Sequence, residues 1–209
     1  MSCAELNQDC QKRKPVAHWL GLSMGKVSKS LRGQLLLDGG GLAGSFFNHT
    51  VVLVCQHDAT GAFGLVLNRT TDNAVGDVIE ADLPDSIKGE PLYLGGPVQP
   101  SALSYLYAPE GCENGDVMEQ LQLRHSLDEL VELGDKFVPS QRLKVFAGYA
   151  GWAPGQLDDE MKRKSWLTYP ADFNLIFSAD AKKLWKQIVS GLGWQYKLLA
   201  DGPDDLSSN

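Results

Sequence analysis

A cysteine and a histidine two residues apart, Cys55 and His57, could perform thiol chemistry. On one predicted strand both side chains leave the same face, roughly 6–7 Å apart. A nearby imidazolium favours the thiolate, which predicts a redox-responsive thiol or one that contacts a ligand. The alternative is an inert cysteine, because Cys55 continues an apolar run and free cysteine is commonly buried.

Consecutive acids and scattered histidines give no catalytic or metal site. The acids of 158–160 point about 100° apart on a predicted helix, so they suit the helix dipole rather than paired acid–base work. The four histidines are dispersed, without a Cys–His spacing that suits zinc. We therefore assign no catalytic residue and no metal ligand.

A glycine-rich segment, Gly39–Gly44, matches the G-x-G-x-x-G pattern of dinucleotide-binding loops. Such a loop opens a crossover helix of about ten or more residues. Here only Ser45–Thr50 separate the last glycine from the next predicted strand. We therefore interpret the segment as a connection between antiparallel strands and predict no cofactor.

Two further stretches combine polar, aromatic and small residues at strand ends. Asn68 and Arg69 end one predicted strand, where the guanidinium either holds an anion or only caps carbonyls and meets a carboxylate. The segment Gly148–Leu157 sets Tyr149 and Trp152 among glycines. It is interpreted either as a cleft or as a turn whose aromatic rings cover a sheet edge.

A covered sheet must position these side chains. Apolar runs predict strands at Gln34–Leu37, Thr50–His57, Ala62–Asn68, Leu92–Leu94, Leu103–Tyr107 and Leu143–Ala147. The second and third form a hairpin with the four-residue loop Asp58–Gly61, and apolar residues on both faces place it centrally. Helices are predicted from the Ser126 capping box to Gly134, from Pro154 past Met161, and from about Ala179 past Leu192. Strands with irregularly spaced helices indicate the α+β class.

Length and charge limit the functions available. The 209 residues, 43% hydrophobic and 22% charged, suit one globular domain over 31–200. Residues 1–30 are predicted to form a flexible basic extension and 201–209 an acidic tail. The net charge of −7 disfavours DNA binding, except through residues 1–32 with six Lys/Arg and two Asp/Glu. The few scattered cysteines and the absence of a long apolar run predict a cytoplasmic protein without membrane contact.

Five blocks in this order resemble the YqgE/AlgH family over about residues 31–200: Gly33–Leu37, Phe47–His57, Gly64–Arg69, Leu94–Val98 and Gly148–Leu157. The resemblance implies a single compact domain with a mainly antiparallel, bifurcated, partly barrel-like sheet surrounded by helices. Members are bacterial, with plastid relatives, and have no established enzymatic activity; the label of transcriptional regulator comes from an association with alginate control. The chain departs from the family pattern at Asp38–Ser45 and in its basic extension.

We therefore expect a binding or regulatory protein rather than an enzyme, with a protein or a small molecule as its partner. The candidate ligand-binding residues lie at strand ends, where loops from a rigid sheet converge: Cys55, His57, Asn68, Arg69, Gly95, Gly96, Pro97, Tyr149, Gly151 and Trp152. Two alternatives stay open. One is a thiol-dependent redox sensor or enzyme centred on Cys55, and the other is DNA binding through the basic segment.

Overall fold

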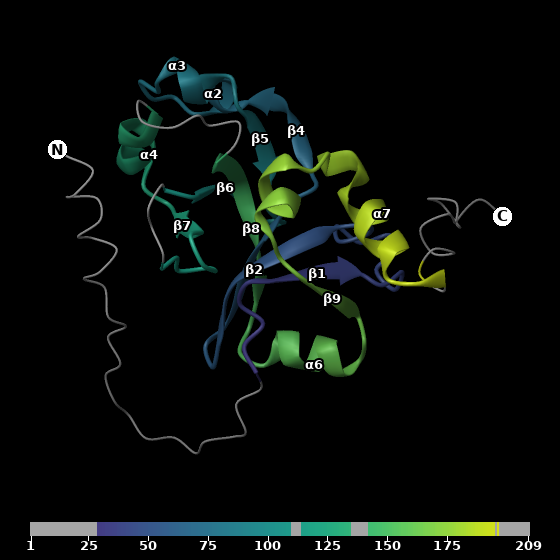
Figure 1. The fold of residues 1–209 in the computed structure, drawn as a ribbon. Helices are drawn as coiled ribbons and strands as arrows, with labels where there is room; N and C mark the ends of the chain where they lie inside the picture. Colours follow the sequence, from purple (N-terminus) through teal and green to yellow (C-terminus); the bar gives the residue numbers. More distant parts are fainter. Residues whose placement is uncertain (1–28, 110–113, 135–141, 195, 197–209) are drawn as a thin grey trace, which may run out of the picture.

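The computed structural model describes residues 29–109, 114–134, 142–194 and 196, which form a mixed α+β domain (Figure 1). The predicted acidic tail, and the basic extension apart from its last two residues, lie outside the described residues. The elements, in chain order, are β1 (Gln34–Asp38), β2 (Val51–Asp58), β3 (Gly61–Val66), β4 (Thr70–Ala74), α2 (Val75–Val78), α3 (Asp85–Lys88), β5 (Pro91–Leu94), β6 (Val98–Tyr107), β7 (Gln122–Arg124), α4 (Leu127–Gly134), β8 (Leu143–Trp152), α6 (Gln156–Lys162), β9 (Trp166–Pro170), the π-helix η1 (Asn174–Ser178) and α7 (Ala181–Gly191).

The sheet has nine strands and branches at β8. Its main path runs β4-β5-β8-β3-β2-β1-β9, and β6 pairs with β8 and with β7. The first half of β8 lies between β5 and β6, whereas its last residues, from Ala150 to Trp152, pair with β3. The pairing of β5 with β8 is parallel and the other ladders are antiparallel. The predicted α+β class with a bifurcated, mainly antiparallel sheet is confirmed, and the sheet does not close on itself.

The hairpin of β2 and β3 is central, as the apolar runs predict. Alternate residues of β1 and β2 enter two different cores, because successive strand side chains point to opposite faces. Leu35 and Leu53 belong to a core closed by α7, whereas Leu36 and Val52 belong to a core closed by α6. Figure 1 shows these two helices on opposite sides of β1 and β2. A third core lies between β5, β6, β8 and the helices α2, α3 and α4.

Several elements differ from the sequence prediction. The hairpin turn has only two residues, since Asp58 already pairs with Gly61. The strand predicted over Leu143–Ala147 continues to Trp152, because β3 supplies a second partner after β5 and β6. The short strands β4 and β9 and the π-helix were not predicted. Among the residues described, none of the helices is both long and apolar enough to cross a membrane.

The glycine-rich segment connects the antiparallel strands β1 and β2, as predicted. The buried carboxylate of Asp38 holds it in place, because its oxygens accept backbone hydrogen bonds from Gly40, Leu42 and His49 at 2.8, 3.2 and 2.9 Å. The indole of Trp185 also donates to the Asp38 carbonyl at 3.1 Å. The segment is therefore a loop fastened to the core by one aspartate.

Candidate functional site

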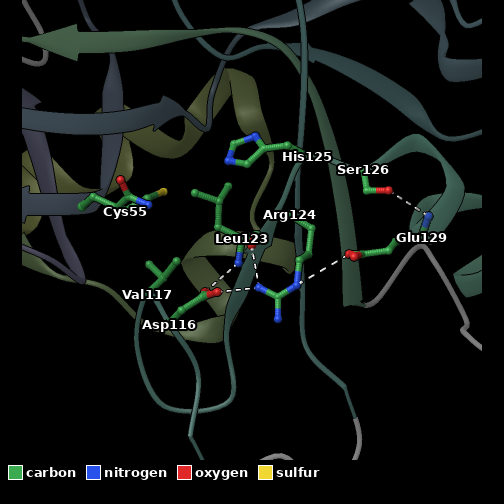
Figure 2. Close-up of a pocket in the computed structure, with 9 residues that line it drawn as sticks. Cys55, Asp116, Val117, Leu123, Arg124, His125, Ser126 and Glu129 are labelled. Atoms are coloured by element: carbon green, nitrogen blue, oxygen red, sulfur yellow. Dashed lines mark hydrogen bonds and ion pairs between the residues drawn. The ribbon is translucent and has the colours of Figure 1, made fainter. Parts of the chain in front are cut away.

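A cavity of about 290 Å³ lies between the end of β2, the strand β7 and the start of α4 (Figure 2). We call it the β7 pocket and define it by its lining residues: Cys55, Gln56, Asp116, Val117, Leu123, Arg124, His125, Ser126 and Glu129. Cys55, Val117 and Leu123 are buried, whereas the acids Asp116 and Glu129 are exposed. The pocket thus has an apolar floor and a charged rim.

Arg124 is held in place on the rim by two acids (Figure 2). Its guanidinium forms an ion pair with Asp116, and its Nε lies 3.7 Å from an Oε of Glu129. Asp116 in turn accepts the backbone N–H of Leu123 at 2.8 Å, which ties the ion pair to β7. The charged side chains of the rim are therefore ordered before a ligand binds. This lowers the conformational entropy that binding would cost.

His125 forms part of the wall and is positioned by β6 and β3. Its Nδ1 lies 3.0 Å from the Ser104 hydroxyl oxygen, and Phe63 meets its ring edge-to-face at 5.7 Å. Phe63 also stacks on Tyr149, with ring centroids 4.9 Å apart. Tyr149, a predicted site residue, therefore supports the wall of the β7 pocket through Phe63 and is not one of the lining residues.

Cys55 is the one predicted site residue that lines this pocket. Figure 2 shows its sulfur directed towards the Leu123 side chain. The residue has no solvent-exposed surface, and its Sγ lies 3.7 Å from the Leu53 carbonyl oxygen. Burial, with a smaller contribution from the nearby Asp116 charge, raises the pKa of the Cys55 thiol well above its ordinary value. The thiol is therefore protonated at neutral pH.

His57 does not share a face with Cys55, so that sequence prediction is wrong. A β-bulge is the reason: Val54 pairs with Gly64 and Gln56 with Phe63, which leaves Cys55 as an extra residue. The extra residue shifts the alternation, and His57 turns towards α6. There its Nδ1 accepts the backbone N–H of Leu31 at 3.0 Å, and its Nε2 lies 3.6 Å from Asp158.

Asn68 joins two backbone segments. Its Oδ1 accepts the N–H of Val51 at 2.8 Å, and its Nδ2 donates to the carbonyl of His49 at 2.9 Å. Both atoms of the amide are therefore used to fix the start of β2. The neighbouring Arg69 donates from Nη2 to the carbonyl of Asn48 at 3.1 Å.

Gly95 and Gly96 are buried where β8 branches, and Pro97 is exposed. The N–H of Gly95 donates to Ala147 at 2.9 Å and its carbonyl accepts from Val66 at 2.8 Å. The turn thus joins β3 to β8. Leu94 also donates to the Arg69 carbonyl at 2.8 Å, and Val98 pairs with Tyr149, so the backbone brings these three segments together. That they form one ligand site stays a prediction.

Trp152 lies in the core beneath α6, away from Cys55, and Gly151 beside it is exposed. One Oε of Glu160 accepts from the indole N–H groups of both Trp152 and Trp166, at 2.9 and 2.7 Å. The structure therefore does not bring Cys55 and Trp152 into one patch: they pack on opposite sides of the sheet.

Replacing Glu160 by alanine is expected to lower the free energy of unfolding by about 2 kcal/mol, because two buried indole N–H groups lose their charged acceptor. Urea denaturation followed by tryptophan fluorescence measures this change. The control is Asp159→Ala, which removes an exposed ion pair with Lys162 and should leave stability close to wild type. Equal effects of the two variants would show that the indole bonds contribute nothing.

Sequence reasoning missed the segment 116–129 that builds most of the β7 pocket. The signal available was the capping box at Ser126, whose hydroxyl does accept the N–H of Glu129 at 3.3 Å. The strand before it has three residues, too few for a recognisable period. Within the part of the chain that the structure describes, no three His, Cys, Asp or Glu side chains form a group that could hold a metal ion.

The comparisons with known proteins agree on the family. The "AlgH-like" family model matches residues 35–197. A UPF0301 protein of Shewanella denitrificans is 36% identical over 178 residues, covering 79% of this chain and 95% of the relative. A UPF0301 protein of Streptomyces coelicolor is 36% identical over 187 residues, covering 86% of this chain and 96% of the relative.

Solved structures agree with the sequence relatives. The solution structure of AlgH from Pseudomonas aeruginosa has a TM-score of 0.64 at 26% identity, covering 88% of this chain and 98% of that protein. A Corynebacterium diphtheriae crystal structure has a TM-score of 0.67 at 20% identity, covering 85% and 95%, and supports the fold. The chain therefore belongs to the AlgH-like family.

Proposed function

We propose that the chain is a binding or regulatory protein that works without catalysis and recognises a ligand in the β7 pocket. The observation that supports this is the combination of a cavity of about 290 Å³ with a buried apolar floor and a fixed charged rim. Pockets that bind small molecules are concave, mostly preformed and equipped with a few placed polar groups.

The charges on the rim favour a ligand with a cationic amine. Asp116 and Glu129 provide two carboxylates against the single guanidinium of Arg124. Arg124 already donates to Asp116 and to the carbonyl of Leu123, so it offers an incoming anion little. Glu129 is joined to Arg124 only at 3.7 Å and is half exposed, which leaves its carboxylate able to accept an ammonium group.

An NMR titration with putrescine tests the proposal, with 1,4-butanediol as an uncharged compound of similar length. We expect saturable shifts of the pocket amides with putrescine and weaker ones with the diol. Glu129→Gln should weaken the binding at least about threefold, because a charged partner becomes neutral. Glu132→Gln, on the exposed side of α4, serves as the control. If neither compound shifts the pocket amides, or if both variants bind alike, the proposal fails.

In this proposal the protein acts in the cytoplasm, and ligand binding changes its contact with a regulatory partner. The support for that part is the family resemblance and the position of the pocket beside the segment that follows the basic extension: Arg32 donates to the backbone carbonyl of Asp116 at 3.1 Å. A transcriptional role would reach DNA through the basic residues of 1–32, since the rest of the chain is strongly acidic.

A thiol-dependent activity is the less favoured alternative, because Cys55 is buried and protonated. With the other three cysteines replaced by serine, iodoacetamide at pH 8 should alkylate Cys55 roughly tenfold or more slowly in the native protein than in urea. Mass spectrometry of quenched samples gives both rates. A native rate close to the denatured one would revive the redox-sensor alternative.

A further inference from the structure

Arg69 lies at the end of the β2–β3 hairpin and is not one of the residues that line the β7 pocket. Its position is fixed from two directions. Its carbonyl accepts the N–H of Leu94, which binds it to the start of the turn before β6. The side chain of Asn68 anchors the preceding residue to the start of β2. The backbone from which the Arg69 side chain extends is therefore fixed.

The partners of this guanidinium are few. Nη2 donates to the Asn48 carbonyl at 3.1 Å, and the carbon Cζ lies 5.0 Å from the centroid of the Phe46 ring. Nε is buried and has no hydrogen-bond partner among the described residues. Arginine has five N–H donors, and buried donors are almost always paired. One neutral carbonyl and one ring face leave most of this capacity unused.

The charge of Arg69 is not balanced by an acid in the part of the chain that the structure describes. Among the described residues, no carboxylate oxygen lies within 4.0 Å of its nitrogens. The buried acid of the adjoining loop, Asp38, uses its oxygens on the backbone N–H groups of Gly40, Leu42 and His49. A partly buried cation without an anion loses hydration and gains no ion pair in return.

We propose that Arg69 binds a small oxyanion, the phosphate or carboxylate group of a ligand. The planar guanidinium fork matches two oxygens of either group and forms charge-assisted hydrogen bonds with them. Phe46 covers one face of the guanidinium and Asn48 holds one of its terminal nitrogens, so the orientation of the fork is set before the anion arrives.

The full-length protein tests this by NMR, with inorganic phosphate in one titration and acetate in another. We expect saturable shifts of the Arg69 Hε resonance and of the backbone amides of 46–48 and 69–70. Binding of either anion supports the proposal, and the tighter of the two identifies the group that the ligand carries. The proposal is overturned if neither anion moves these resonances.

Two variants separate binding at Arg69 from general charge effects. Arg69→Met should weaken the anion affinity roughly tenfold or more, whereas Arg163→Met, which removes an exposed arginine at the end of α6, should change it less than about twofold. If Arg69→Met does not fold, as judged by circular dichroism, Arg69→Lys decides, since it keeps the charge and loses the fork. Affinity in Arg69→Lys within about twofold of wild type refutes the proposal.

Discussion

Replacing Gly96 by alanine is expected to lower the free energy of unfolding by at least about 3 kcal/mol, near the upper end of what overpacking costs. A Cβ on this glycine would lie 2.0 Å from the carbonyl carbon of Tyr149 and 2.3 Å from the nitrogen of Ala150. Both are backbone atoms, so no rotamer change relieves the contact. The turn would have to move away from β8, and the ladder from β8 to β3 starts at Ala150.

Equilibrium unfolding in urea measures the loss, and Gly89→Ala is the matched control. Gly89 ends α3 with φ of −82°, and a Cβ there meets nothing within 4 Å. Alanine should therefore change stability by less than about 1 kcal/mol, and any change should be favourable because the unfolded chain loses freedom. Similar stabilities for the two variants would mean that the turn at Gly96 can move to accommodate a Cβ with little loss of stability. Gly96 was selected from the sequence as a ligand-binding residue, and this contact gives it a structural role.

The parts of the fold that the sequence predicted well are those specified by local patterns. The hairpin of β2 and β3 is recognisable because apolar residues occupy both faces, and the structure buries Val51 through Cys55 completely. The glycine motif at 39–44 could be distinguished from a nucleotide-binding loop, because too few residues follow it for a crossover helix before the next strand. The capping box at Ser126 located the start of α4 to within one residue.

The candidate site was harder to predict because it depends on contacts that leave no local pattern. A single extra residue at Cys55 reverses the direction of His57, and the sequence carries no mark of that bulge. The rim of the β7 pocket depends on an ion pair between Asp116 and Arg124, eight positions apart on either side of a tight turn. Tyr149 reaches the pocket only through Phe63 on another strand.

Lys144 places an ammonium group in the buried interior of the sheet. The residue lies on β8 with 6% of its surface exposed. Its Nζ lies 4.2 Å from the centroid of the Tyr93 ring and 3.5 Å from the Leu67 carbonyl oxygen. Among the described residues, no carboxylate oxygen lies within 4.0 Å of this ammonium group. Burial therefore lowers the pKa of Lys144 from 10.5 to about 8.

Because the pKa of Lys144 is lowered in the folded protein, the charged form of this lysine destabilises the folded state. Below pH 8 both states hold the proton, and the fold bears the full penalty of the buried charge. Between about pH 8 and 10.5 the folded lysine releases its proton while the unfolded one keeps it, so stability gains from this group as pH rises. The difference between the two pKa values corresponds to about 3 kcal/mol at about 1.4 kcal/mol per pH unit.

Lys144→Met should accordingly raise the free energy of unfolding at pH 7 by about 2–3 kcal/mol, because the chain keeps its apolar length and loses the buried charge; the lost contact with Tyr93 offsets part of the gain. The gain over wild type should fall to less than half at pH 9.5. Comparing the two proteins at each pH matters, because the raised pKa values of Cys55 and Tyr93 lower stability in the same alkaline range in both.

Urea denaturation of wild type, Lys144→Met and Lys183→Met at pH 7 and 9.5 makes the comparison. Lys183 is exposed on α7, so its replacement should leave stability unchanged at both pH values. A gain from Lys144→Met that does not shrink at pH 9.5 would show that the methionine stabilises by packing alone. A loss at pH 7 would instead mean that the ring of Tyr93 compensates the charge fully, and that the buried ammonium group stabilises the sheet.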